Sequence, residues 1–328
     1  MFNQPEKLLE AYPLKVEKII KGRGNYVCKT MEKDYVLMPF GGQELRAKSL
    51  ANLLVFLQEN NPNMSMEQVV LTREGHYLVA DEEENRYLLK EKVQGREHSL
   101  LNENGAWKEE ESKEVVRTLA RLHKSLLTYG KEPLSFSYEL EYQKKLRLLI
   151  RVKNYMRSKN GRNDFERIYL ETFPHFIRQA KEAVEGFSNL PAEGDYIGIC
   201  HGDFNQHNIF IEGKRVSVCN FENIRIAWPV SDFVNYLRKL MEKLSYDFEV
   251  ARKLFLVYEE ERVLSEAEKR LCYNLFLFPE KFYKLTNHYD NTRKSLVTGR
   301  QQEKLKELIQ KEEEREAFLI NLFSFLVE

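Results

Sequence analysis

Residues 201–222, HGDFNQHNIFIEGKRVSVCNFE, join a polar loop to two short apolar runs and carry the strongest signal in the chain. In the loop, Asp203 and Asn208 are separated by four residues. The apolar runs that follow are β-rich and are separated by a Glu-Gly-Lys turn, so we expect a hairpin. Such a hairpin would bring Asn220, at its end, back beside Asn208, at its start.

The spacing of Asp203 and Asn208 is that of a phosphotransferase loop. Phosphoryl transfer needs a cation at the nucleotide phosphates, a carboxylate and a second ligand for Mg²⁺, and a base for the acceptor hydroxyl. In kinases the base and the second ligand share one loop with the spacing D-x-x-x-x-N. Asp203 is therefore the candidate base and Asn208 the candidate metal ligand. The alternative is that both side chains merely satisfy a turn.

The regions on either side of this stretch differ in pattern. Residues 15–93 predict strands interrupted by one helix over 41–60, with three of the strands in 69–93. After Gly95 the chain is mostly helical apart from the hairpin, and residues 109–126 form the clearest amphipathic segment.

These patterns together predict an α+β, two-lobed, protein-kinase-like fold. We expect a small lobe with an antiparallel β-sheet over residues 1–92 and a large, mainly helical lobe over 93–328 that carries the hairpin. The hinge between the lobes is expected at 92–95.

Composition limits the function classes. The 328 residues contain 51 Lys and Arg and 51 Asp and Glu, a balance that argues against a nucleic-acid partner. The four cysteines include no CxxC pair, which favours buried thiols in a reducing compartment over disulfides or zinc. The start of the chain has no signal-peptide pattern and no run of 18 apolar residues occurs, so we expect a soluble intracellular protein without membrane contact.

The chain resembles the aminoglycoside phosphotransferases and choline kinases, and most closely the CotS-type spore coat proteins. The resemblance rests first on HGDxxxxN followed by a hairpin that ends in a D-F-[DE] segment. It extends over nearly the whole chain through DYVLMPF, RYLLKEKVQGRE, TLARLHKS, PVSDFVNYLRKLMEK and LFLFPEKFYKLTNHYDN. It implies a role in sporulation, other spore coat proteins as partners, and cytoplasmic synthesis followed by deposition in the spore coat.

Two departures from the family pattern bear on activity. The metal-binding carboxylate of the D-F-[DE] segment is replaced by Asn220, whose amide brings no negative charge to a hard cation. The phosphate-binding lysine of the family's Leu-Lys-Pro-Phe segment is replaced by Met38, so Glu44 would lose its ion-pair partner. Because both changes fall on one site, we expect a pseudokinase that uses no cofactor, with Asp203 as a vestigial base.

Two alternatives stay open. Glu222 lies two residues beyond Asn220 and on a strand would point to the same face, where it could bind the metal with Asn208. Lys29 or Lys33 could reach the phosphates. The protein would then be an active small-molecule or protein kinase that uses ATP and Mg²⁺. A third reading is a nucleotide-sensing module that binds without chemistry.

The resemblance also assigns supporting roles. Asp232 in PVSDF would hold the backbone of the HGD loop through hydrogen bonds, and His201 would brace the same loop. These contacts would maintain the fold whether or not nucleotide binds. His123, on a helix, is expected to be a hydrogen-bonded core histidine.

Overall fold

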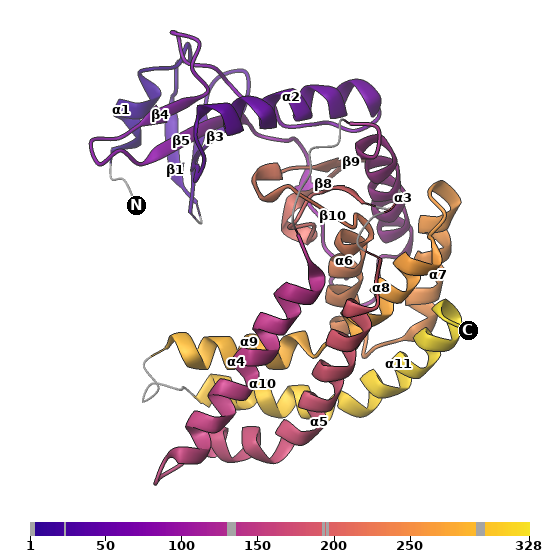
Figure 1. Cartoon of the computed structure of the whole chain (residues 1–328). Coiled ribbons are helices and arrows are strands. Elements are labelled where there is room, and N and C mark those ends of the chain that lie inside the picture. The colour runs from indigo at the N-terminus through magenta and orange to yellow at the C-terminus, as the bar shows by residue number, and fades with distance from the viewer. Residues whose placement is uncertain (1–3, 23, 130–135, 192–193, 195–196, 293–298) are drawn as a thin grey trace. The chain divides into compact units, whose positions relative to one another are not determined.

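The computed structural model describes every residue except 1–3, 23, 130–135, 192–193, 195–196 and 293–298 (Figure 1). The chain forms two compact units. The first comprises residues 1–130 together with 201–224, and the second comprises 131–200 together with 225–328. A small antiparallel sheet lies in the first unit and most of the helices lie in the second, so the predicted α+β class is confirmed.

The first unit contains a five-stranded sheet in the order β1-β2-β3-β5-β4, with all neighbours antiparallel. Its strands are β1 (Lys18–Lys21), β2 (Tyr26–Lys29), β3 (Asp34–Pro39), β4 (Leu78–Ala80) and β5 (Arg86–Glu91). The expectation of three strands within 69–93 is wrong: only β4 and β5 form there, and Val69 contributes an isolated bridge to Lys90. A hydrogen-bonded turn between Thr72 and Gly75 ends the pairing soon after Val69.

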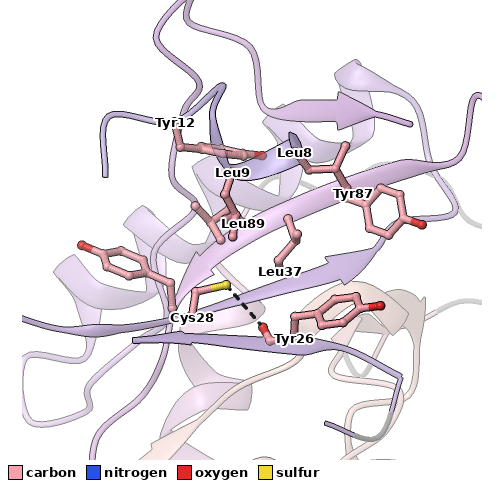
Figure 2. Close-up of a cluster of buried hydrophobic side chains, with 9 residues drawn as sticks. Leu8, Leu9, Tyr12, Tyr26, Cys28, Leu37, Tyr87 and Leu89 are labelled. Atoms are coloured by element: carbon pink, nitrogen blue, oxygen red, sulfur yellow. Dashed lines mark hydrogen bonds between the residues drawn. The ribbon is translucent and has the colours of Figure 1, made fainter. Parts of the chain in front are cut away.

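The two faces of this sheet have different environments. On one face, side chains of β2, β3 and β5 contact helix α1 (Pro5–Leu9) and the residues after it (Figure 2). This apolar cluster comprises Leu8, Leu9, Tyr12, Tyr26, Cys28, Tyr35, Leu37, Tyr87 and Leu89. Because neighbouring residues of a strand point to opposite faces, Met38, Leu88 and Lys90 lie on the other face. A lysine in a central strand thus points away from the apolar cluster.

The rest of the first unit holds the predicted hairpin. Its further elements are α2 (Glu44–Asn60), β6 (Arg96–Glu97), α3 (Glu109–Leu126), β8 (Ile209–Glu212) and β9 (Arg215–Val218), with short 3₁₀ turns at Gln206–Asn208 and Phe221–Asn223. The strands β8 and β9 pair from Ile209 opposite Val218 to the turn at Gly213, so the hairpin is confirmed. Met66 makes a parallel bridge to Val218, which brings the following residue, Glu67, to the end of the hairpin.

The second unit is mainly helical. It contains α4 (Tyr138–Ser158), α5 (Asp164–Ser188), α6 (Val230–Lys243), α7 (Phe248–Glu261), α8 (Glu266–Leu277), α9 (Glu280–Asn291), α10 (Gly299–Gln310) and α11 (Glu312–Leu326), with one strand pair, β7 (Gly198–Cys200) and β10 (Arg225–Ala227). Phe282 of α9 stacks between Tyr169 and Phe176 of α5, with ring centroids 4.5 and 4.4 Å apart. Aromatic stacking of this kind adds to the burial that fixes the helices.

Spatial grouping and secondary structure divide the chain differently. The hairpin and α3 group with the small sheet, whereas the predicted division at 92/93 follows the change from strands to helices. All four cysteines are buried free thiols. Among the helices of the described residues, none is both long and apolar enough to cross a bilayer.

Candidate functional site

The loop before the hairpin is braced by His201, whose side chain is fully buried. Its Nε2 lies 2.8 Å from the carbonyl oxygen of Cys219, which can only accept, so Nε2 carries a proton. Its Nδ1 lies 3.2 Å from the backbone N–H of Asp203, which can only donate, so Nδ1 does not. A neutral His201 thereby connects the start of the loop to the end of the hairpin.

Gly202 is required by the same turn. Its φ is +80°, and a Cβ atom there would lie 2.1 Å from the carbonyl oxygen of Asn223. We therefore expect Gly202→Ala to lower the free energy of unfolding by at least about 2 kcal/mol in urea titrations, since strain and a backbone clash add. Gly213→Ala, at φ +62° with open space, should cost only about 1 kcal/mol. If Gly202→Ala and Gly213→Ala lost the same unfolding free energy, the close approach of Gly202 to the carbonyl oxygen of Asn223 would impose no constraint.

Asp203, Asn208 and Asn220 are joined in one chain of hydrogen bonds. The Nδ2 of Asn208 donates to the backbone oxygen of Asp203 at 2.8 Å and to its Oδ2 at 3.2 Å. The Nδ2 of Asn220 donates to Oδ1 of Asn208 at 2.8 Å. Asn220 has φ +66°, a conformation that Asn adopts more readily than most residues. The predicted meeting of positions 208 and 220 is thus present in the structure.

Lys90, which the sequence analysis did not single out, lies at one end of this series of hydrogen bonds. The Nζ of Lys90 lies 3.3 Å from Oδ1 of Asn220 and 2.9 Å from Oε2 of Glu67, and it also contacts Oε1 of Glu222. The side chains of Lys90 and Glu67 are 1% and 3% exposed. The other oxygen of Glu67 accepts the backbone N–H of Asn220 at 2.9 Å. One ammonium group and two carboxylates therefore surround Asn220.

Lys90 and Asp203, at the two ends of this series of hydrogen bonds, fix the orientation of both asparagine amides. Lys90 can only donate, so the oxygen of Asn220 must face it, and the nitrogen of Asn220 must face Asn208. The acceptors on Asp203 in turn require the nitrogen of Asn208. Consequently Oδ1 of Asn208, the atom that would bind a metal, already accepts an N–H from Asn220. An aspartate at position 220 could not make that bond.

The charges of the cluster depend on one another. Burial alone would lower the pKa of Lys90, but Glu67 and Glu222 outweigh it and hold that pKa above its usual range. Burial raises the pKa of Glu67, although Lys90 opposes the rise. Removing the lysine would leave two carboxylates close together with little solvent.

These residues do not fit a divalent cation as they stand. Magnesium prefers oxygen ligands and is usually held by one or two carboxylates together with waters and substrate phosphates. Here the Asn208 oxygen is occupied by an amide N–H, the Glu222 carboxylate is paired with Lys90, and a buried ammonium group lies beside them. A cation at this position would have to displace Lys90.

The sequence matches a family model described as Spore coat putative kinase YutH over residues 5–322. The chain belongs to this family. The resemblance to CotS-type spore coat proteins is thereby confirmed at family level. No curated protein matches the sequence significantly.

Solved structures support the fold of this YutH-family chain. It is similar to an aminoglycoside phosphotransferase from Alicyclobacillus acidocaldarius subsp. acidocaldarius, with a TM-score of 0.81, 20% identity, and coverage of 98% of this chain and 96% of that one. It is also similar to amicoumacin kinase hAmiN, solved with AMP-PNP, Ca²⁺ and Ami. The TM-score is 0.66 and the identity 16%, with coverage of 96% of this chain and 94% of that one. A third similar structure is the AMP-bound complex of spectinomycin phosphotransferase. Its TM-score is 0.64 and its identity 11%, with coverage of 95% of this chain and 96% of that one. At these identities the likeness confirms the kinase-like fold.

The remaining predicted site residues of this YutH-family protein lie as follows. Met38 is half-buried on the sheet face that carries Lys90. The carboxylate of Glu44 accepts the backbone N–H of Tyr77 at 2.6 Å. Lys33 pairs with Glu91 at 2.8 Å, and Lys29 is an exposed residue of β2. The cation that contacts Asn220 is thus Lys90, from β5.

Asp232 lies in the other unit, fully buried in the first turn of α6. Its expected hydrogen bonds to the HGD loop stay a prediction.

Sequence reasoning missed both Lys90 and Glu67. Lys90 follows Tyr87, Leu88 and Leu89, three buried residues of a central strand. A lysine that continues such an apolar run is a usable signal, because lysine is almost never fully buried without a partner. Glu67 lies in a loop with no regular pattern, and only the tertiary structure places it.

Proposed function

We propose that this protein is a pseudokinase of the spore coat, a structural or interaction component in a phosphotransferase fold. The observation that carries the proposal is the hydrogen bond from Asn220 to Oδ1 of Asn208, the oxygen that would bind a metal in an active kinase, with Lys90 on the other side of Asn220. An amide N–H and an ammonium group take the place of a carboxylate and its metal. Catalysis of phosphoryl transfer depends on charge positioned at the phosphates, so losing the metal removes its main source.

The coat role rests on the family description. Other spore coat proteins are the proposed partners, with synthesis in the cytoplasm and deposition in the coat. In this reading Asp203, His201 and Asp232 maintain the loop, and no ATP or Mg²⁺ is used.

A second candidate is an active kinase with rearranged ligands. The exposed carboxylate of Asp203 favours it, since a base must be accessible to an acceptor. In that case Glu222 would leave Lys90 and bind Mg²⁺ with Asn208, and Lys90 would be free to meet the phosphates. A third candidate is a nucleotide-sensing module that binds without turnover.

ATP hydrolysis separates these candidates without knowledge of an acceptor. We expect the purified protein, at millimolar ATP and Mg²⁺, to release phosphate no faster than its Asp203→Ala variant. Hydrolysis that Asp203→Ala abolishes would contradict the pseudokinase proposal. Loss of the same activity in Glu222→Gln would then assign the metal to Glu222.

A further inference from the structure

A second cluster of ligating side chains lies between two helices of the helical unit. His175 of α5 faces Glu312 and Glu316 of α11. The Nε2 of His175 is 3.0 Å from Oε1 of Glu312 and 3.7 Å from Oε1 of Glu316. The two glutamates are four residues apart on a helix and therefore share a face. Among the described residues, this is the group of histidine and carboxylate ligands close enough to share a metal ion.

Neighbouring donors hold Glu312 and Gln179 in fixed orientations. Arg315 donates to Oε1 of Gln179 at 2.8 Å and to Oε1 of Glu312 at 2.7 Å, and it also donates to two backbone carbonyls of α8. Arginine has no acceptor, so the nitrogen of Gln179 must point the other way. That nitrogen lies 2.9 Å from Oε1 of Glu312 and 3.0 Å from Nε2 of His175.

The tautomer of His175 decides what its Nε2 presents to the two carboxylates. This nitrogen lies 3.0 Å from the Gln179 nitrogen and 3.0 Å from Oε1 of Glu312, so it carries a lone pair in one tautomer and donates to the carboxylate in the other. Glu312 is a buried residue, 8% exposed, and its Oε2 has no hydrogen-bond partner among the described residues. A buried carboxylate oxygen without a donor is costly unless something supplies positive charge.

We propose that His175, Glu312 and Glu316 bind a zinc ion. Zinc takes imidazole and carboxylate ligands at about 2.0–2.2 Å in a tetrahedron, which places ligand atoms roughly 3.4 Å apart. The separations of 3.0 and 3.7 Å bracket that value. Gln179 and Arg315 both donate to Oε1 of Glu312, the proposed ligand atom, and would act as the outer partners that orient it. Three protein ligands leave the fourth position open to water or to a group from a partner.

A water molecule is the competing explanation. A cavity of about 20 Å³ is lined by Glu312, Arg315 and Phe176, and a space of that size can hold one water. That water could satisfy Oε2 of Glu312 without any metal. A proton shared between His175 and the glutamates is a further possibility, and metal titration distinguishes all three.

The test is calorimetric titration of chelator-treated protein with Zn²⁺, followed by thermal unfolding. We expect one Zn²⁺ per chain and a higher melting temperature, with no effect of Mg²⁺. His175→Ala and Glu316→Gln should each weaken Zn²⁺ affinity at least roughly tenfold, since each removes a ligand. His288→Ala and Glu313→Gln make the same changes at exposed positions and should leave affinity unchanged.

Absence of stoichiometric Zn²⁺ binding would overturn the proposal in favour of water or a proton. Binding that persists unchanged in both His175→Ala and Glu316→Gln would place the ion elsewhere and would overturn it equally. Circular dichroism of each variant shows whether it is folded before its affinity is compared. The outcome is independent of the pseudokinase proposal, because none of these residues belongs to the Asp203 site.

Discussion

Replacing Lys90 by methionine should lower the free energy of unfolding by about 3–5 kcal/mol, because it leaves buried carboxylates without their partner. Glu67 and Glu222 would face each other with little solvent between them. The measurement is urea unfolding followed by circular dichroism. Lys33→Met is the matched control, since it breaks the exposed pair with Glu91 and should cost less than about 1 kcal/mol.

The loss of unfolding free energy in Lys90→Met should be smaller at low pH than at high pH. The pKa of Glu67 is already raised in the folded protein, so protonation favours the folded state as pH falls toward that pKa. Without Lys90 the rise becomes larger, and Lys90→Met should therefore be less destabilised at pH 5 than at pH 8. Adding Glu67→Gln and Glu222→Gln should recover much of the loss. A loss equal to that of Lys33→Met would show that the buried cluster has little effect on stability.

Replacing Asn220 by aspartate should make the stability of the protein depend on divalent cations. The variant loses the N–H donated to Asn208, so two oxygens would lie about 2.8 Å apart with no proton between them. Aspartate tolerates the backbone conformation at this position, so the change acts through the side chain. We expect a lower melting temperature in EDTA and a recovery in Mg²⁺ of about 1.4 kcal/mol at a concentration ten times the dissociation constant.

The control for this variant is Asn223→Asp, the same change at an exposed residue three positions later. It should show no response to Mg²⁺. The double change Met38→Lys with Asn220→Asp should in addition bind Mg-ATP, seen as a stabilisation that a chelator removes. If Asn220→Asp melts identically in EDTA and Mg²⁺, then Asn220 does not replace a metal ligand in the way we propose.

Much of the fold was predictable because its signals are local. The hairpin of β8 and β9 follows from alternating apolar residues around Gly213, and α3 coincides with the predicted 109–126. The segment 69–93 was harder, because a strand needs a partner over several residues, and Val69 finds one for a single bridge. Helix α1 was also missed, since five residues carry almost no periodic signal.

At the site, the sequence predicted the meeting of Asn208 and Asn220 but not the buried ammonium group of Lys90. The replacement of a phosphate-binding lysine by Met38 stays a prediction, and Lys90 reaches Asn220 from the neighbouring strand. The substitutions at positions 38 and 220 do not reveal that the sheet places Lys90 beside Asn220. The pairing of Lys90 with Glu67 arises from β5 and a loop, and no pattern in the sequence connects these.

The most direct measurement is thermal unfolding of the unmodified protein with and without millimolar ATP and Mg²⁺. A ligand that binds only the native state raises the melting temperature. Because Asn208, Asn220, Lys90 and Glu222 already satisfy one another, we expect the two melting temperatures to be equal. A rise that requires Mg²⁺ and disappears in EDTA would contradict the claim that this site has lost its metal and nucleotide.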